Sequence, residues 1–410
     1  MGQFFTRERF GRPQVQAGLL LMLFLAQCLW LIHSQLRSSQ PEPGELARLH
    51  LGLRQWHGGP PAGLDLGAQP AERDALLAFA PGATMDPDHS PLWYLVASAP
   101  LAVWPRPLDA APFSSWGGLA RLPFLIFGLL LGASLWYVAR RLYGNAGGFI
   151  ALTLYCFSPG VLRASTLWLS APEMGAVWAS FGAVFTAIAV SHTLYAPREV
   201  VLWNGRRILL LGLSLALAIG SQYSLLLLAP LALAFMLYVA HTRRAAALAI
   251  WASACGIGLL LLWAAFSFHG SAMWQALRQA DFFGIAWPAF GMTGAYQQLA
   301  SQFGQASPAL VLALPAALVA YLAWPRARYF GNTAPLLVAL LFLFLRLGTP
   351  HMPGLGFLLI AVPFLFVFVA GVIADLLETR QQSLVLACVS GLLVSSAVWN
   401  LWQLWRLRAP

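Results

Sequence analysis

Residues 355–377 read LGFLLIAVPFLFVFVAGVIADLL, an apolar run that decides the class of fold. At about 1.5 Å of rise per residue, a helix of this length covers the roughly 30 Å hydrocarbon core of a bilayer. The composition of the whole chain agrees, since 59% of its 410 residues are hydrophobic, 9% are charged and the mean hydropathy is +0.70. These values predict an all-α polytopic membrane protein, because a lipid-facing strand edge would leave backbone polar groups without partners.

Similar runs recur along the chain and predict about 11 transmembrane helices. They lie at 14–34, 118–139, 147–167, 172–191, 208–222, 225–241, 245–267, 307–324, 333–346, 355–377 and 383–405. The apolar run 91–105 is too short to cross the membrane, because its rise is about 22 Å. We expect a juxtamembrane or interfacial helix there.

The distribution of arginine predicts the orientation, because cytoplasmic connections near the spans are enriched in positive charge. Three arginines precede the first span, and later arginines fall in every second connection: Arg7, Arg9, Arg12; Arg140, Arg141; Arg198, Arg206, Arg207; Arg243, Arg244; Arg326, Arg328; Arg380. The N-terminus is therefore expected in the cytoplasm, with residues 35–117 and 268–306 as outer loops. This pattern also accounts for the net charge of +10 without a nucleic-acid partner.

Seven acidic residues gather within residues 35–90 of the first outer loop, at positions 42, 45, 65, 72, 74, 86 and 88. Within it, residues 44–56 carry apolar side chains at 46, 49, 53 and 56, which predicts a short amphipathic helix on the membrane surface. Glu45 falls in the first turn of that helix. Position alone favours a simple role for Glu45, in which its negative charge complements the helix dipole and stabilises the helix by about 0.3–1 kcal/mol.

Two further motifs carry polar groups toward the outer face. In Met85-Asp-Pro-Asp88-His89-Ser90-Pro91-Leu-Trp-Tyr94, Asp88 and His89 are expected at the depth of the headgroups. The simpler interpretation of this motif is a capped turn with interfacial aromatic anchors. The segment Ser170-Ala-Pro-Glu173 matches a capping box, yet Glu173 also opens a span on the same side as Glu45. The two interpretations of Glu173 are compatible.

The order of these features resembles a known family. After the acidic surface helix come His89-Ser-Pro-Leu-Trp-Tyr94, then Arg121-Leu-Pro123, Ala139-Arg-Arg-Leu-Tyr-Gly144 and Ser158-Pro159. Over residues 14–192 the chain resembles the GT-C glycosyltransferases, among them the protein O-mannosyltransferases and lipid A aminoarabinose transferases. Beyond residue 192 the likeness is one of topology. We therefore expect an N-terminal module, 1–192, that contains loop 35–117, and a C-terminal region, 193–410, that contains loop 268–306.

The resemblance implies transfer of a sugar from a polyprenyl-phosphate donor to a hydroxyl of a glycan, lipid or protein. It places the reaction on the outer face of the bacterial inner membrane. In such a reaction Glu45 would be the general base and Glu173 an orienting carboxylate. Substrate or phosphate contacts would come from Glu42, Arg48, Asp88, His89, Tyr94, Arg346 and His351. For Arg346 the simpler alternative is an arginine that extends to the headgroups.

The chain departs from the family at two places. The family often has an Asp-Glu pair at the start of the surface helix, and here Gly44-Glu45 keeps the second acid alone; Ser170 stands where relatives commonly have Asp. Glu42 is an alternative base if the loop folds back. The resemblance implies no certain cofactor and leaves a divalent metal ion open, because members of the family differ in this need, while His50 and His57 match no recognised metal-site spacing.

Two other classes of function remain as alternatives. A lipid-linked glycan transporter or flippase is disfavoured by the near absence of charge at mid-span and of paired broken helices. A non-catalytic GT-C relative that binds a lipid carrier is kept open by the missing first acid.

Overall fold

The fold comes from a computed structural model, which describes residues 12–38, 43–59, 61, 86, 88–106, 108, 112–166, 174–195, 204–280, 282–350, 352 and 354–406. Regular structure in these residues is entirely helical, with no strand among them. The expected all-α class is therefore confirmed. Three of the predicted site residues, Glu42, Glu173 and His351, lie outside the described residues.

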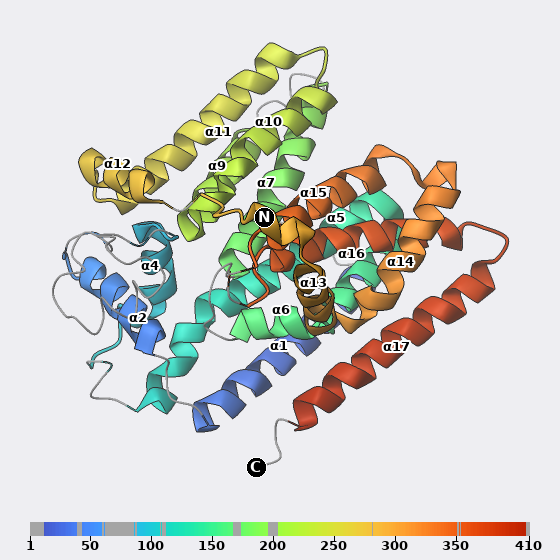
Figure 1. The fold of residues 1–410 in the computed structure, drawn as a ribbon, viewed down its shortest axis with the longest axis horizontal. Helices are drawn as coiled ribbons and strands as arrows, with labels where there is room; N and C mark the ends of the chain where they lie inside the picture. Colours follow the sequence, from blue (N-terminus) through green and yellow to red (C-terminus); the bar gives the residue numbers. More distant parts are fainter. Residues whose placement is uncertain are drawn as a thin grey trace, which may run out of the picture. The chain divides into compact units, whose positions relative to one another are not determined.

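Figure 1 shows the helices in chain order. They are α1 (Arg12–Ser38), α2 (Pro43–Trp56), α4 (Pro91–Ser98), η1 (Ala99–Leu101), α5 (Phe113–Cys156), α6 (Pro159–Thr166), α7 (Met174–Thr193), α9 (Asn204–Ser221), η3 (Tyr223–Leu227), α10 (Leu228–Val239), α11 (Arg244–Ala265), α12 (Gly270–Gln279), η4 (Trp287–Gly291), α13 (Thr293–Ala306), α14 (Pro308–Ala323), η5 (Pro325–Ala327), α15 (Phe330–Gly348), α16 (Phe357–Leu377) and α17 (Gln382–Arg406). Helix α2 and the short helix α4 with η1 lie where the two short helices are expected, and their place at the membrane surface stays a prediction.

Among the described residues, seven helices are long and apolar enough to cross a membrane: α1, α5, α7, α11, α15, α16 and α17. An eighth crossing is formed if α13 and α14, which are bent by 112° at Ser307, make one span. These helices are those of an integral membrane protein. The structure does not confirm the expected number of eleven crossings.

The difference in count has a physical basis in helix composition and length. Helix α9 has 18 residues, but its first turn carries Asn204, Arg206 and Arg207, so it is less apolar over its full length than the seven helices above. The apolar helix Tyr223–Val239 is shorter than 18 residues. The expected span 118–139 lies within the 44 residues of α5, and the expected span 147–167 begins in α5 and continues into α6. Helix α5 is interrupted at Tyr143 (φ −129°, ψ 15°) and Gly144 (φ 72°, ψ −170°), inside the expected connection.

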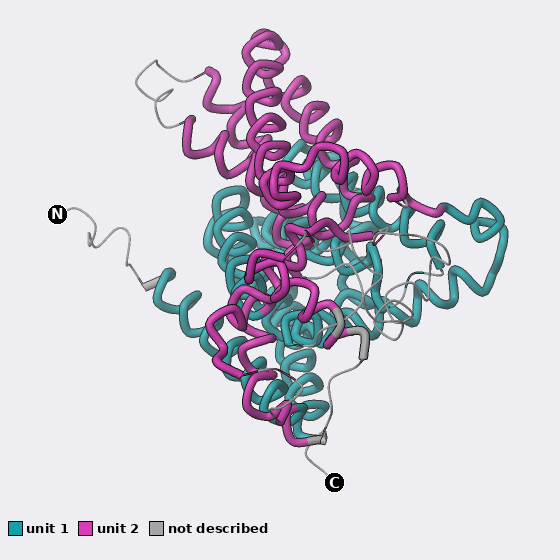
Figure 2. Tube along the Cα trace, turned by 90° about the vertical axis from the view of Figure 1, so that its left-hand side faces the viewer, with its two compact units in different colours: residues 1–35, 125–170, 285–410 teal, residues 36–124, 171–284 magenta. Residues whose placement is uncertain are grey.

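The chain forms two compact units, which Figure 2 colours separately. Unit 1 comprises Met1–Gln35, Leu125–Ser170 and Ile285–Pro410, and unit 2 comprises Leu36–Phe124 and Ala171–Gly284. Each unit draws on both sides of residue 192. The expected division into 1–192 and 193–410 coincides with no boundary of these units and stays a prediction.

Unit 1 is built around α16, whose side chains are buried from Phe357 through Ala374. A helix that is apolar on every face is buried among other helices or in lipid, and here α15, α14 and α17 pack against it. Polar links join the outer members of this unit: the Gln27 amide donates to the carbonyl of Cys156 (3.2 Å), and Asn400 donates to Gln27 (2.7 Å).

Unit 2 contains α7, α9, α10 and α11 together with the α2–α4 pair. Small residues allow its helices to approach closely; a Cβ on Gly212 of α9, for example, would lie 2.8 Å from the carbonyl oxygen of Ala254 in α11. Two side chains at the end of α2 fix that helix in the unit. Trp56 donates from Nε1 to the carbonyl of Leu95 (3.0 Å), and Gln55 donates to that of Ala265 (2.7 Å).

Candidate functional site

The turn before α4 is organised around Asp86. Its Oδ1 accepts hydrogen bonds from the backbone N–H groups of Asp88 (2.8 Å) and His89 (3.3 Å). Its Oδ2 accepts from His89 Nδ1 (3.0 Å) and from the hydroxyl of Tyr94. An ionised carboxylate only accepts, so His89 carries a proton on Nδ1. All three side chains of this Asp86–His89–Tyr94 cluster are buried.

Local sequence explains how the turn passes into a helix. Ser90 is the N-cap of α4, with its Oγ accepting from the N–H of Leu92 (3.2 Å), and Pro91 occupies the first helical turn. The capped turn expected from the motif is therefore confirmed. The ring of Trp93, next along the helix, stacks on His89 with centroids 6.1 Å apart and meets Phe124 edge-on at 5.4 Å.

The surroundings of Asp86 favour its charged form. Burial alone would raise its pKa, but the charge and hydrogen bond of His89, the charge of Arg48 and the hydrogen bond from Tyr94 outweigh burial and lower the pKa well below its usual range. Burial and then the charge of Asp86 raise the pKa of Tyr94 well above its usual value. Asp86 is thus a fixed anion that orients its neighbours, and Tyr94 is a fixed donor.

A second buried group lies on α2. Glu45, in the first turn of that helix as predicted, forms an ion pair with Arg121 of α5. Each residue is 5% exposed, and the Arg121 guanidinium lies 5.7 Å from the centroid of the Phe113 ring. Arg48 lies one turn beyond Glu45 on the same face of α2, and its charge acts on Asp86. Basic and acidic side chains therefore alternate in the order Arg121, Glu45, Arg48 and Asp86.

Backbone hydrogen bonds hold this turn against the break between α9 and η3. The N–H of Ser90 donates to the carbonyl of Gly220 (2.9 Å), and the N–H of Tyr223 donates to that of Asp88 (3.0 Å). Gly220 makes the approach possible, because a Cβ there would lie 2.9 Å from Leu92 Cδ2 and 3.1 Å from Ser90 Oγ.

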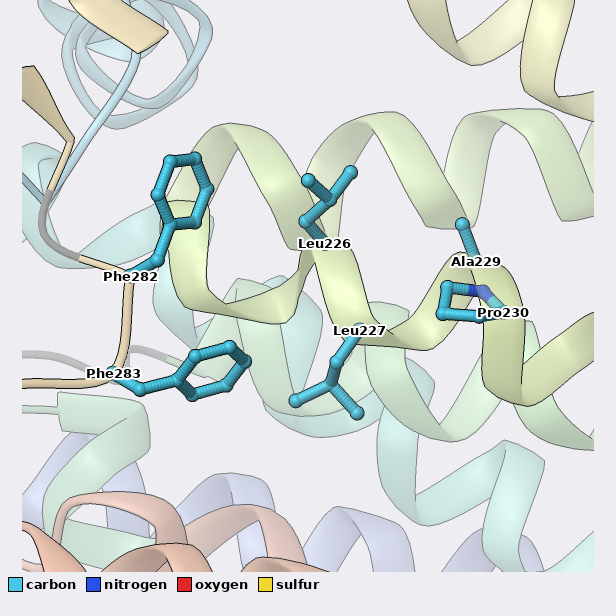
Figure 3. A pocket seen from close by; sticks show the side chains of 6 residues that line it. All are labelled: Leu226, Leu227, Ala229, Pro230, Phe282 and Phe283. Atoms are coloured by element: carbon cyan, nitrogen blue, oxygen red, sulfur yellow. The ribbon is translucent and has the colours of Figure 1, made fainter. Parts of the chain in front are cut away.

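An apolar pocket of about 470 Å³ begins one turn beyond that break. Its walls come from η3, from the start of α10 and from the segment after α12, and the two phenylalanine rings reach from that segment toward the helices (Figure 3): Leu226, Leu227, Ala229, Pro230, Phe282, Phe283. Phe283 adopts φ 80°, which is strained for a residue other than glycine, and its N–H donates to Ser224 Oγ (3.3 Å). All six side chains that line the pocket are apolar.

The structure brings together most of the predicted site residues that it describes. Glu45, Arg48, Asp88, His89 and Tyr94 all lie in unit 2, on α2, in the turn before α4, or on α4 itself. Within this group Tyr94 is committed to Asp86, so its expected contact with substrate would use the ring rather than the hydroxyl.

Arg346 belongs to unit 1 and is buried, with 3% exposure, so it does not extend to headgroups as the simpler interpretation held. Its Nε donates to Gln302 Oε1 (2.9 Å), and its two terminal nitrogens donate to the carbonyls of Thr349 (2.8 Å), Met352 (3.1 Å) and Gly354 (3.4 Å). These bonds close the turn after α15. A phosphate contact by Arg346 stays a prediction, and it would compete with four internal hydrogen bonds.

Two functional candidates were not singled out by the sequence. Asp86 was one acid among seven within residues 35–90, and its spacing of three residues before His89 was the available signal. Arg121 stood in the Arg-Leu-Pro motif, but nothing in its spacing linked it to Glu45, which lies 76 positions earlier.

Asp86, Asp88 and His89 offer three potential metal-ligating atoms within 4.8 Å of one another. Such a cluster does not by itself indicate a metal. Both oxygens of Asp86 already accept hydrogen bonds, so a cation would have to displace the His89 Nδ1–H or the Tyr94 hydroxyl.

Comparisons with family models, with curated proteins and with solved structures found no match for this chain.

Proposed function

We propose that the protein is a membrane glycosyltransferase of the GT-C type, which moves a sugar from a polyprenyl-phosphate donor to an acceptor hydroxyl. One observation carries the proposal. The charged groups around Asp86 and the apolar pocket meet on a single segment, because Tyr223 bonds to the turn before α4 and Leu226, one turn later, lines the pocket. A polar site directly joined to an apolar one fits an amphiphile with a charged head and a long hydrocarbon tail.

The proposed chemistry assigns the groups as follows. Glu45 accepts the proton of the acceptor hydroxyl while that oxygen bonds to the anomeric carbon of the sugar. The bond from the anomeric carbon to the phosphate oxygen breaks, and polyprenyl phosphate leaves with one more negative charge. Arg48, supported by His89, stabilises that developing charge.

The ion pair with Arg121 is compatible with a base, because it is made by the ionised carboxylate, the form that accepts a proton. Glu173 as the orienting carboxylate, together with contacts from Glu42 and His351, rests on the resemblance alone. A divalent metal ion is not required by this scheme, and the acceptor is a glycan, lipid or protein.

The proposal includes a location. The protein would lie in the bacterial inner membrane with eleven crossings, its N-terminus in the cytoplasm and its active site on the outer face. The arginines of alternate connections support that orientation.

The burial of the Glu45–Arg121 pair favours a second candidate, binding of the lipid carrier without turnover. In that case the pair only holds α2 against α5. The two candidates differ in whether the Glu45 carboxylate is needed for transfer once the protein is folded.

The test measures release of polyprenyl phosphate by full-length protein in lipid nanodiscs supplied with polyprenyl-phosphate sugars. Glu45→Gln alone leaves Arg121 as an unpaired buried charge, which costs about 3–5 kcal/mol of stability. The double variant Glu45→Gln/Arg121→Gln removes that charge, so we expect it to recover much of the thermal stability while transfer stays at least about 100-fold below wild type.

The matched control is Glu378→Gln, which breaks an arginine–carboxylate pair with Arg326 (3.3 Å) whose side chains are 71% and 68% exposed. We expect full activity from this variant, because exposed pairs contribute about 0–1 kcal/mol. If the double variant transfers sugar at the wild-type rate, Glu45 is not the base. If wild type binds the carrier and transfers nothing from any donor tried, carrier binding replaces transfer as the function.

A further inference from the structure

The break between α9 and η3 holds buried polar groups that no described contact satisfies. Ser221 and Gln222 are both 0% exposed. The Ser221 hydroxyl and both amide atoms of Gln222, Oε1 and Nε2, make no hydrogen bond in the described part of the chain. Buried polar atoms without partners are costly, and where proteins keep them they commonly meet a ligand or an ordered water.

Helix packing places these groups at one end of α7. Arg207 of α9 donates to the carbonyl of Ala189 (3.4 Å), and two turns further along α9, Ser214 Oγ is the nearest atom to a Cβ built on Gly182 (2.9 Å). Both contacts fit one antiparallel register, and the same register sets Ser221 level with Gly175. The unsatisfied groups therefore lie near the first turn of α7.

The same break adjoins the charged cluster described above. Gly220 and Tyr223, on either side of Ser221 and Gln222, carry the two backbone bonds to Ser90 and Asp88. The apolar pocket follows one turn later along η3. The unsatisfied amide and hydroxyl thus lie between the carboxylate cluster and the site for an apolar chain.

We propose that Ser221 and Gln222 form a subsite for an uncharged group that bears several hydroxyls, and that this group is the sugar ring of the donor. The assignment to a donor sugar rests on the proposed function. An amide offers two donors and one acceptor group in a plane, which pairs with two adjacent hydroxyls, and the serine hydroxyl pairs with a third or with the ring oxygen.

The chemistry of the segment selects a neutral sugar over a charged one. Residues 208–227 contain no acidic or basic side chain. A cationic amino sugar would require a carboxylate at the subsite itself; Ser221 and Gln222 supply none, and Asp86 in the adjoining turn already accepts four hydrogen bonds. An acidic sugar would place its charge in a buried site where the side chains are an amide and a hydroxyl, and such burial is costly.

The experiment compares three probes on full-length protein in nanodiscs: polyprenyl-phosphate hexose, polyprenyl phosphate without sugar, and a free methyl hexoside. In wild type we expect the hexose-bearing carrier to bind about 10-fold or more tightly than the bare carrier, since each good buried hydrogen bond contributes roughly this factor. Gln222→Met and Ser221→Ala should each remove most of that difference and leave the dissociation constant of bare polyprenyl phosphate unchanged.

Ser214→Ala is the matched control. Ser214 is also a buried serine of α9 whose hydroxyl makes no hydrogen bond among the described residues, and it lies on the same face two turns from Ser221. We expect it to leave all three affinities unchanged. Gln222→Met keeps the length of the side chain without its polar atoms, so we expect its melting temperature without ligand to equal or exceed that of wild type.

The subsite is overturned if wild type binds the two carriers with equal affinity. It is also overturned if the Gln222→Met variant still prefers the hexose-bearing carrier. In either case ordered water satisfies the polar atoms of Ser221 and Gln222. A loss of stability in Gln222→Met with no change in binding would also overturn it. If sugar transfer is never observed but the methyl hexoside binds in a Gln222-dependent way, the proposed function fails and the subsite stands.

Discussion

At the residue scale, Asp86 shows how a single carboxylate organises a turn. Four donors converge on its two oxygens, and two of them are backbone N–H groups of its own turn. The others come from His89 and Tyr94, so the positions of a ring nitrogen and a phenol are set by the same charge. Neutralising that charge should loosen the turn and the start of α4 together.

We expect Asp86→Asn to lower the free energy of unfolding at pH 7 by about 1–3 kcal/mol, because a buried set of donors loses its charged acceptor. The folded pKa of Asp86 lies below its unfolded value of about 3.9, so its contribution is complete above that value and is lost as pH falls through the folded pKa. Denaturation in mixed micelles at a series of pH values measures this. The difference in free energy of unfolding between wild type and variant should be constant above about pH 5 and should decrease below about pH 4. A difference that increases as the pH falls would contradict this role of Asp86.

At the scale of elements, the site depends on how closely the turn before α4 approaches the end of α9. Glycine at position 220 permits two main-chain hydrogen bonds to cross between these elements. The break after α9 also exposes backbone groups that an unbroken helix would have satisfied internally, and the turn supplies their partners. The end of α9 and the position of the turn before α4 therefore depend on the same two hydrogen bonds.

We expect Gly220→Ala to destabilise the protein by about 1–3 kcal/mol, because its Cβ would overlap Leu92 and Ser90 in a packed region. The change should also weaken donor binding, since it displaces the turn that carries His89. Gly205→Ala, in the first turn of the same helix, is the control: a Cβ there meets nothing within 4 Å. It should be neutral or stabilising by up to about 1 kcal/mol. Thermal unfolding in detergent compares the two, and equal melting temperatures would refute the packing account.

At the scale of the whole molecule, the helices of an integral membrane protein form two units that interleave along the sequence. The Asp86–His89–Tyr94 cluster, the apolar pocket and the buried polar groups of Ser221 and Gln222 all lie in unit 2. This unit combines residues 36–124 with residues 171–284. Unit 1 is built around α16, which is buried along nearly its whole length. The candidate chemistry is thus collected in one unit.

The proposed orientation predicts which side of the membrane each connection faces. Single cysteines at positions 57 and 270, in a background without native cysteine, should react with an impermeant maleimide added outside intact cells. Cysteines at 146 and 205 should react only after the membrane is permeabilised, because they adjoin arginine-bearing connections. All four positions are exposed in the fold, so burial does not protect them. Labelling of 205 from outside would invalidate the orientation and, with it, the outer active site.

Prediction from the sequence succeeded where the signal is local. The helix at Pro43–Trp56, the capped turn before α4 and the break near Gly144 follow from apolar periodicity, from the polar motif at 85–94 and from the gap between two apolar runs. The number of crossings was harder to predict, because an apolar run does not reveal that a helix such as α9 includes the polar residues before it, or where α13 bends away from α14.

By itself the sequence determined the class of molecule and its short helices, because burial of apolar residues in lipid and the capping of helix ends depend on neighbours within a few positions. Only the tertiary structure decided that Glu45 pairs with Arg121, that Asp86 rather than Asp88 holds His89 and Tyr94, and that Gln222 is buried without a protein partner among the described residues. Those contacts join helices far apart in the chain, and their geometry depends on helix register, which apolar composition leaves undetermined.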